Sequence, residues 1–151
     1  ARPEGSDLLV YEFDHNHFFH CGVGENEGDG IQLIDQRAGE NSREILIHHN
    51  TFDGDGVSTT GVGSLANKKS QQPIDPPGAD AVKEKIWIYN NNFFALKRAA
   101  ITGGYHTYIF NIIIKNSPVG IRHSGAEGWV ANNLTHNTPP SREHQYQRWG
   151  Q

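Results

Sequence analysis

The phrase IWIYNNNFF at residues 86–94 returns as YIFNIIIKN at 108–116 and again as WVANNLTHN at 129–137. Ile88, Ile109 and Val130 hold equivalent places in the three copies and lie 21 residues apart. A self-similar period of roughly 20 to 25 residues, made of short β-rich runs with polar turns between them, is typical of a solenoid. The repeat therefore predicts stacked coils, each of which supplies strands to a common stack.

Alternation within the phrase separates an inward face from an outward face. We expect Ile86 and Ile88 to point inward and Trp87 and Tyr89 to point outward, because successive side chains of a strand face opposite sides. The asparagine that follows falls where the strand must bend, and asparagine tolerates unusual turn backbone. Its amide can also bond to the like residue one coil away. The sequence thus predicts an asparagine ladder along the stack.

Two earlier segments carry the same phrase at wider intervals. ILIHHNTF (45–52) places Ile47 opposite Ile88 and His49 opposite Asn90, and EFDHNHFF (12–19) continues these columns. A small residue followed by an apolar one comes after each phrase and is interpreted as the next strand of each coil. The pairs are Gly30-Ile31, Gly56-Val57, Ala100-Ile101 and Gly120-Ile121. These segments predict about five coils.

One stretch interrupts the pattern. Residues 58–85 are rich in Gly, Pro, Ser and Lys and have no sustained period, so they predict one long inserted loop, either functional or disordered. Residues 140–151 lack the repeat and predict an irregular tail. Length favours a single domain over residues 1–151. Because only about five coils can be counted, we hypothesise a fragment of a larger β-helix or one chain of a larger assembly.

The form I-x-N-N-x-F followed by G-I, over roughly residues 8–137, resembles the right-handed parallel β-helix of the pectate-lyase-like superfamily. The resemblance implies an all-β, single-stranded solenoid in an extracellular or periplasmic location. It also implies a carbohydrate-active protein, foremost a polysaccharide lyase or epimerase acting on an acidic polysaccharide. A non-catalytic β-helix for glycan binding or adhesion stays open, as does a structural subunit or homo-oligomer that assembles through its coil ends.

Composition argues against other classes of protein. Charged residues make up 20% of the chain and the formal net charge is −4, without the basic cluster that a nucleic-acid footprint requires. No apolar run is long enough to predict membrane insertion. Cys21 is the single cysteine, so an internal disulfide is impossible.

Aromatic residues dominate the outward positions of the repeat. Sugar rings present flat C–H faces that stack on Trp and Tyr, so these residues predict a polysaccharide-binding surface. The candidates are Trp87, Tyr89, Tyr108 and Trp129. An apolar outer face is also, and more commonly, explained by a covering loop, the C-terminal tail or a second chain.

Acidic side chains cluster near the small-residue positions and predict a Ca²⁺ site, since calcium prefers oxygen ligands. Asp29 precedes Gly30, while Asp53 and Asp55 alternate in DGDG, and we expect the two groups to occupy the same place in successive coils. DGDG is also an ordinary turn sequence. His15, His17, His20, His48 and His49 could bind a transition metal, although His15 and His49 fall in the asparagine column, where a ladder role explains them.

Elimination at a uronic acid requires a base near C5 and a group that neutralises the carboxylate. The resemblance implies a lysine or arginine base. The catalytic candidates are Lys97, Arg98, Arg122 and His123, with Thr102 expected beside Arg122. A solvated turn explains the same residues without catalysis.

Overall fold

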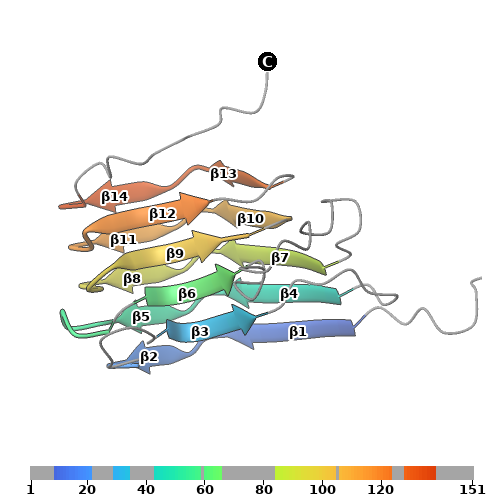
Figure 1. The fold of residues 1–151 in the computed structure, drawn as a ribbon, viewed down its shortest axis with the longest axis horizontal. Coiled ribbons are helices and arrows are strands. Elements are labelled where there is room, and N and C mark those ends of the chain that lie inside the picture. The colour runs from blue at the N-terminus through green and yellow to red at the C-terminus, as the bar shows by residue number, and fades with distance from the viewer. Residues whose placement is uncertain are drawn as a thin grey trace, which may run out of the picture.

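The computed structural model describes residues 9–21, 29–34, 43–58, 60–65, 84–104, 106–123 and 128–138. Within these ranges the chain is all-β, with no helix (Figure 1). No helix in these ranges is therefore long and apolar enough to cross a membrane. The strands are β1 (Leu9–Asp14), β2 (His17–Phe19), β3 (Asp29–Ile34), β4 (Arg43–His48), β5 (Thr51–Asp53), β6 (Thr60–Leu65), β7 (Glu84–Tyr89), β8 (Asn92–Phe94), β9 (Ala99–Gly103), β10 (Thr107–Phe110), β11 (Ile113–Lys115), β12 (Val119–His123), β13 (Trp129–Ala131) and β14 (Leu134–His136).

The strands form three parallel sheets, which we name A, B and C. Sheet A has the order β1-β4-β7-β10-β13, sheet B the order β2-β5-β8-β11-β14, and sheet C the order β3-β6-β9-β12. The chain visits A, B and C in turn, so each round adds one layer to the stack (Figure 1). Among the described residues, layers 1 to 4 contain a strand of every sheet, and layer 5 contains β13 and β14. The predicted all-β stack of parallel repeats is confirmed.

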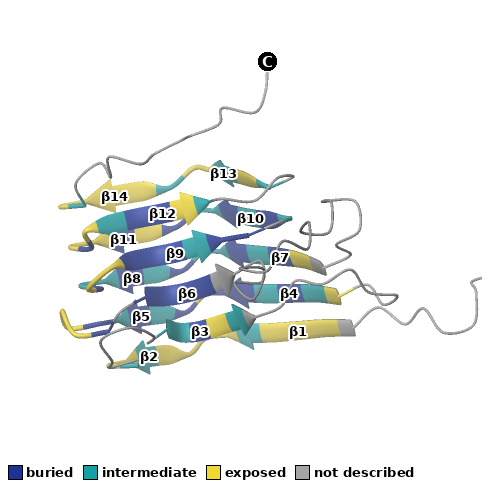
Figure 2. Ribbon diagram, in the orientation of Figure 1, coloured by how far each residue is buried: buried dark blue, intermediate teal, exposed yellow. Residues whose placement is uncertain are grey.

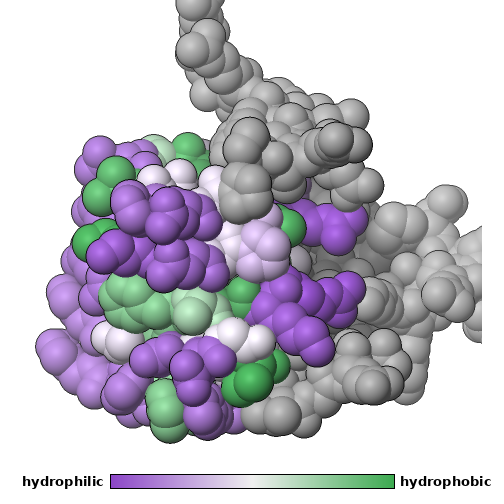
Figure 3. Space-filling model, turned by 90° about the vertical axis from the view of Figure 1, so that its left-hand side faces the viewer, coloured by the Kyte–Doolittle hydropathy of each residue, from purple (hydrophilic) through white to green (hydrophobic). Residues whose placement is uncertain are grey.

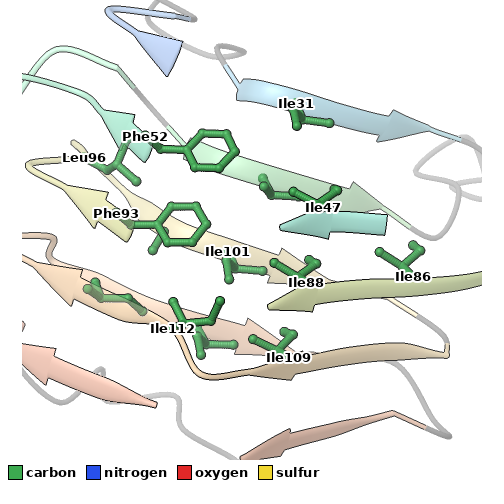
Figure 4. Packing of buried hydrophobic residues seen from close by; sticks show 14 of the residues in the cluster. Ile31, Ile47, Phe52, Ile86, Ile88, Phe93, Leu96, Ile101, Ile109 and Ile112 are labelled. Carbon is green, nitrogen blue, oxygen red and sulfur yellow. The ribbon is translucent and has the colours of Figure 1, made fainter. Parts of the chain in front are cut away.

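The repeat copies lie on top of one another in register. Ile88 pairs with Ile47 on one side and with Ile109 on the other, and Ile109 pairs with Val130. Ile47, Ile88 and Ile109 are 0% exposed. Burial of each such side chain stabilises the fold by about 1.5–3 kcal/mol. The core therefore runs as columns along the stack, buried in its middle layers and more exposed at both ends (Figures 2 and 4).

A second core column is aromatic. Phe18, Phe52 and Phe93 stack face to face, with ring centroids 4.6 and 4.7 Å apart and interplanar angles of 5°. Phe52 and Phe93 are fully buried inside sheet B (Figure 4). In the next layer Ile114 takes this place opposite Phe93. The alignment of Phe52 with Phe93 in the repeat is thus confirmed.

The corner between sheets A and B uses the left-handed backbone that the asparagines predicted. Asn90, Asn111 and Asn132 all have φ of 53°, and His49 in the same column has φ of 54°. Only glycine and a few polar residues adopt this conformation readily. Each strand of sheet A therefore ends at a residue type that can make the bend.

Sheet C differs from the sequence interpretation in layer 2. Ile31 pairs with Val62 rather than with Val57, which is exposed in a turn. A Cβ on Gly61 would lie 2.5 Å from the Phe93 ring, so the strand needs glycine at that point. The assignment of Gly56-Val57 to this strand was wrong because both Gly-Val pairs fit the pattern locally.

The inserted loop is shorter than predicted, because the range 58–85 contains β6 and the beginning of β7. Thr60–Leu65 belongs to sheet C because it pairs with β3 and β9. Residues 59 and 66–83 lie outside the described residues, as does the predicted tail at 140–151.

Candidate functional site

Sheet A presents two outward columns, which we call together the outer face. The register aligns the outward residues of the repeat from layer to layer, and Trp87 and Tyr89 lie on the outward side as predicted. One column is Glu12, Leu46, Trp87, Tyr108 and Trp129, and the other is Asp14, His48, Tyr89, Phe110 and Ala131. All four residues predicted to bind a polysaccharide therefore lie on one surface.

The rings of the outer face stack on one another along the layers. Trp87 and Tyr108 have ring centroids 4.3 Å apart at 21°, and Tyr89 and Phe110 are 5.1 Å apart at 5°. Such contacts contribute about 0.5–1.5 kcal/mol each beyond the burial of area. Since these rings cover one another's faces, they point their edges away from the sheet.

Trp129 is the exception among these rings. It lies in layer 5 and stacks on Phe110 with centroids 5.2 Å apart, and it is 43% exposed. Tyr108 meets it edge-on at 67°. The predicted stacking of a sugar on a ring face therefore has its best platform at Trp129, while the other rings offer edges and polar tips.

A polar row follows the corner beside the outer face. The side-chain amide of Asn132 donates to Oδ1 of Asn111 at 2.7 Å, and that of Asn90 donates to Nε2 of His49 at 3.3 Å. His15 stacks on His49 with centroids 5.2 Å apart. The ladder role of these two histidines, which the repeat predicted, agrees with this geometry. Hydrogen-bonding groups thus recur once per layer along the edge of the face.

Glu12 begins a hydrogen-bonded chain at the layer 1 end of the outer face. Oε1 of Glu12 lies 2.8 Å from Nε2 of His48, and Nδ1 of His48 lies 2.8 Å from Nδ1 of His49. One proton arrangement satisfies every contact: Asn90 donates to His49, His49 donates from Nδ1 to His48, and His48 donates from Nε2 to Glu12. The chain fixes the ring of His48, which also stacks on Tyr89 at 4.8 Å.

The charges at this end change two pKa values. A hydrogen bond from His15, at 2.9 Å, lowers the pKa of Asp14, so this carboxylate is ionised at neutral pH. Burial raises the pKa of Tyr89, and the negative charges of Glu12 and Asp14 raise it further. Tyr89 therefore carries a neutral hydroxyl.

Sequence reasoning missed the pairing of Glu12 with His48. The two residues are 36 positions apart, and no local motif connects them. The register could have indicated it, since Glu12 pairs with Leu46 and His48 is the next outward residue of that strand.

The catalytic candidates lie elsewhere in the fold. Lys97 and Arg98 are exposed in the turn from β8 to β9, on an edge of the stack whose surface is mostly hydrophilic (Figure 3). Arg122 and His123 end β12 in sheet C, where Thr102 pairs with Arg122 as predicted. Among the described residues, these four side chains are on other elements than the outer face and do not join its aromatic columns.

His123 packs inward at the corner from sheet C to sheet A. It bonds the backbone of Thr107, and its Nε2 atom is buried without a hydrogen-bond partner among the described residues. Burial lowers the pKa of His123, and the bond to Thr107 raises it by a smaller amount. The side chain is therefore neutral at physiological pH and packs as part of the structure.

The carboxylates proposed for calcium occupy different sheets. Asp29 begins β3 and pairs with Thr60, whereas Asp53 ends β5 and pairs with Phe19. The expectation that they hold equivalent places in successive coils was wrong, because the strand equivalent to β3 begins after the DGDG turn. Asp55 donates its backbone N–H to Asp53 Oδ1 at 3.1 Å and its carboxylate meets His20 at 2.9 Å. In the described part of the chain, no three His, Cys, Asp or Glu side chains are arranged to hold a metal ion.

A small pocket lies between sheets B and C, lined by Phe18, Phe52, Ser58 and Leu96 among others. It has room for about one water molecule, so it does not fit a sugar. On the outer face, by contrast, stacked rings and a row of polar side chains continue side by side over several layers.

No family model, no curated protein and no solved structure matches this chain. The functional conclusion therefore depends on the outer face and on the chemistry of its residues.

Proposed function

We propose that this chain binds a polysaccharide along the outer face of sheet A. The observation that supports the proposal is the aromatic column that ends at Trp129, a residue that is 43% exposed. Aromatic side chains supply a large contact area to a ligand and carry a polar tip when they are Tyr or Trp. Exposed apolar surface rimmed by polar residues is typical of a binding site.

The spacing of the layers favours a polymer over a single sugar. Neighbouring parallel strands lie about 4.8 Å apart, which is close to the length that one sugar residue occupies along an extended chain. A polysaccharide running along layers 3 to 5 would meet one outward ring and one corner side chain per residue. Asn111 and Asn132 supply amides at that interval.

We also propose that the three sheets close into a right-handed parallel β-helix of the pectate-lyase-like type. Support comes from the constant order in which the chain visits sheets A, B and C, and from the bend residues at equivalent corners, such as Asn111 and Asn132. Such a helix would make the outer face one long wall of the molecule.

The test is a binding panel of neutral and acidic polysaccharides, measured by affinity electrophoresis and calorimetry with and without calcium. We expect at least one polymer to bind and Trp129→Ala to weaken it roughly 2- to 10-fold, the equivalent of losing an aromatic contact of 0.5–1.5 kcal/mol. Phe19→Ala is the control, because Phe19 is 53% exposed but lies on sheet B. Absence of binding to every polymer would overturn the proposal.

A lyase or epimerase on an acidic polysaccharide is the second candidate. The carboxylate of Glu12 favours it, since this side chain is 54% exposed, is held by His48 at 2.8 Å and can act as a general base. Incubation with pectate, alginate and glycosaminoglycans, with and without calcium, tests it through the absorbance of the unsaturated product and through proton exchange at C5. No absorbance change and no exchange on any polymer would remove this candidate.

A further inference from the structure

The charges of the outer face are unevenly distributed. Its aromatic end, at Tyr108 and Trp129, has no ionised outward neighbour on the described parts of β10 and β13. Its other end carries the carboxylates of Glu12 and Asp14 on β1. On the outward positions just before these columns, Glu44 of β4 pairs with Lys85 of β7. The described outward positions of sheet A therefore carry three carboxylates, on Glu12, Asp14 and Glu44, against the single ammonium of Lys85.

We propose that the outer face selects a neutral polysaccharide, whose sugars lack carboxylates, and rejects polyuronates. This inference rests on the proposed function and narrows it. A polymer that runs along the whole stack from Trp129 reaches layer 1, where it meets Glu12 and Asp14. The ligand class thus follows from the charge at the far end of the face.

The two carboxylates are positioned as hydrogen-bond acceptors. Glu12 has one oxygen, Oε1, at 2.8 Å from His48, and Asp14 has one oxygen, Oδ2, at 2.9 Å from His15. Both side chains remain accessible, with exposed fractions of 54% for Glu12 and 48% for Asp14. A carboxylate has about four lone-pair sites, so the remaining ones can accept hydroxyl protons. Sugar hydroxyls are donors of this kind, and hydrogen bonds to an ionised acceptor are stronger than neutral ones.

A uronate meets the same two groups unfavourably. Its carboxylate offers no proton at neutral pH and has the same sign of charge as Glu12 and Asp14. Like charges brought together across an interface oppose binding. The effect extends over about one Debye length, roughly 8–10 Å near physiological ionic strength, which corresponds to about two layers of the stack. The uronates beside layers 1 and 2 would therefore be repelled even when they do not touch the carboxylates.

The positions of the two carboxylates also indicate which substitutions should weaken the preference for neutral polymers over polyuronates. Gln at position 12 keeps an oxygen that accepts from His48, and Asn at position 14 keeps one that faces His15. The double variant Glu12→Gln/Asp14→Asn thus removes two charges while it preserves the shape of the face. Asp53→Asn is the matched control, because Asp53 lies on sheet B. In the parent, Oδ1 of Asp53 accepts the N–H of Asp55 at 3.1 Å, and the amide oxygen of the variant can accept the same bond.

The experiment compares glucomannan, a neutral polymer, with polygalacturonate and alginate at low and at high ionic strength. We expect the parent to bind glucomannan at least about tenfold more tightly than either polyuronate at low salt, and the preference to narrow at high salt. The double variant should bind the polyuronates severalfold more tightly than the parent does, whereas Asp53→Asn should not. Circular dichroism confirms that each variant is folded.

Two results would overturn the inference and leave the proposed function intact: equal or tighter binding of a polyuronate by the parent, or an unchanged preference in the double variant. Absence of binding to all three polymers, extended to the wider panel, would instead remove the proposed function and this inference with it. The two failures are therefore distinguishable.

Discussion

Asn50 donates both its backbone N–H and its side-chain amide to a single oxygen, Oδ1 of Asn91, at 2.9 and 3.1 Å. The two residues are 41 positions apart and are 0% and 1% exposed. Asn91 in turn donates to the backbone carbonyl of Ile47 at 2.7 Å. The same relationship joins Asn16 to Asn50, and the backbone of Ile112 to Asn133. A buried amide ladder thus connects the layers at the inner side of the corner between sheets A and B.

Removal of one member of this ladder should destabilise the whole stack. Asn91→Ala leaves two donors of Asn50 and the carbonyl of Ile47 without these partners in a buried place. We expect a loss of about 1–3 kcal/mol for each unsatisfied donor, measured by urea unfolding. Asn92→Ala is the control, since Asn92 is only half-buried and points outward from sheet B. Equal losses for the two variants would contradict the ladder's importance.

The outward residues of the same corner are constrained by backbone conformation. Asn111 has φ of 53° and is exposed. Asn111→Val should destabilise the fold by about 1–2 kcal/mol because a β-branched residue is strained in the left-handed region. Asn111→Gly should cost less, although valine has the higher strand propensity. Thermal midpoints of the two variants measure the order, and a more stable valine variant would show that the corner relaxes.

Small residues form one column of sheet C, and substitutions there test the packing of the core. The column consists of Gly30, Gly61, Ala100 and Gly120. A Cβ on Gly61 would lie 2.5 Å from the ring of Phe93, so Gly61→Ala should cost about 1–3 kcal/mol through overpacking. Gly120→Ala is the matched control, because its Cβ would meet Ile114 at an ordinary 3.5 Å. That variant should be neutral or more stable by up to about 1 kcal/mol. Denaturant midpoints distinguish the two, and similar midpoints would show that Phe93 moves aside.

His123 should make stability depend on pH. Burial holds its pKa in the fold below 6.5, so its neutral form is favoured by folding. The stability gained is complete above about pH 6.5 and is lost as pH falls through that value toward the lower folded pKa. His123→Asn keeps a donor for Thr107 without a titrating ring, so its unfolding free energy should fall less between pH 8 and pH 5 than that of the parent.

Urea unfolding at both pH values measures this difference. His136→Asn supplies the control, since His136 is exposed and the same substitution there leaves the buried ring of His123 in place. Parallel pH profiles for the parent and His123→Asn would contradict the role of burial at His123.

Much of the stack was predictable because its information is local and repeated. The interval of 21 residues places Ile88, Ile109 and Val130 in register, and alternation then assigns every neighbour to the inward or the outward side. The left-handed corner followed from the chemistry of asparagine, even where His49 replaces it. These features depend on the strand period and on single-residue conformational preference, which a sequence displays directly.

The strand of sheet C in layer 2 was not predictable in the same way. Gly56-Val57 and Gly61-Val62 match the pattern equally well, and only the tertiary structure shows that the first pair lies in a turn, with a φ of 72° at Gly56, and the second in the strand. The arrangement of the rings on the outer face was also only partly predictable from the sequence. Sequence placed the rings in one column but could not show that Trp87 and Tyr108 cover each other's faces at 4.3 Å.

The amino-acid sequence by itself determined that this chain repeats, that its repeats are β-strands, and which side chains of sheet A lie in the core, because hydrophobic alternation and the fixed interval leave one consistent alignment there. Tertiary structure alone decided which atoms of these side chains form hydrogen bonds between layers. The contact of Glu12 with His48, and the double donation of Asn50 to Asn91, join residues 36 and 41 positions apart. Such contacts depend on the lengths of the segments between layers, which carry no period of their own.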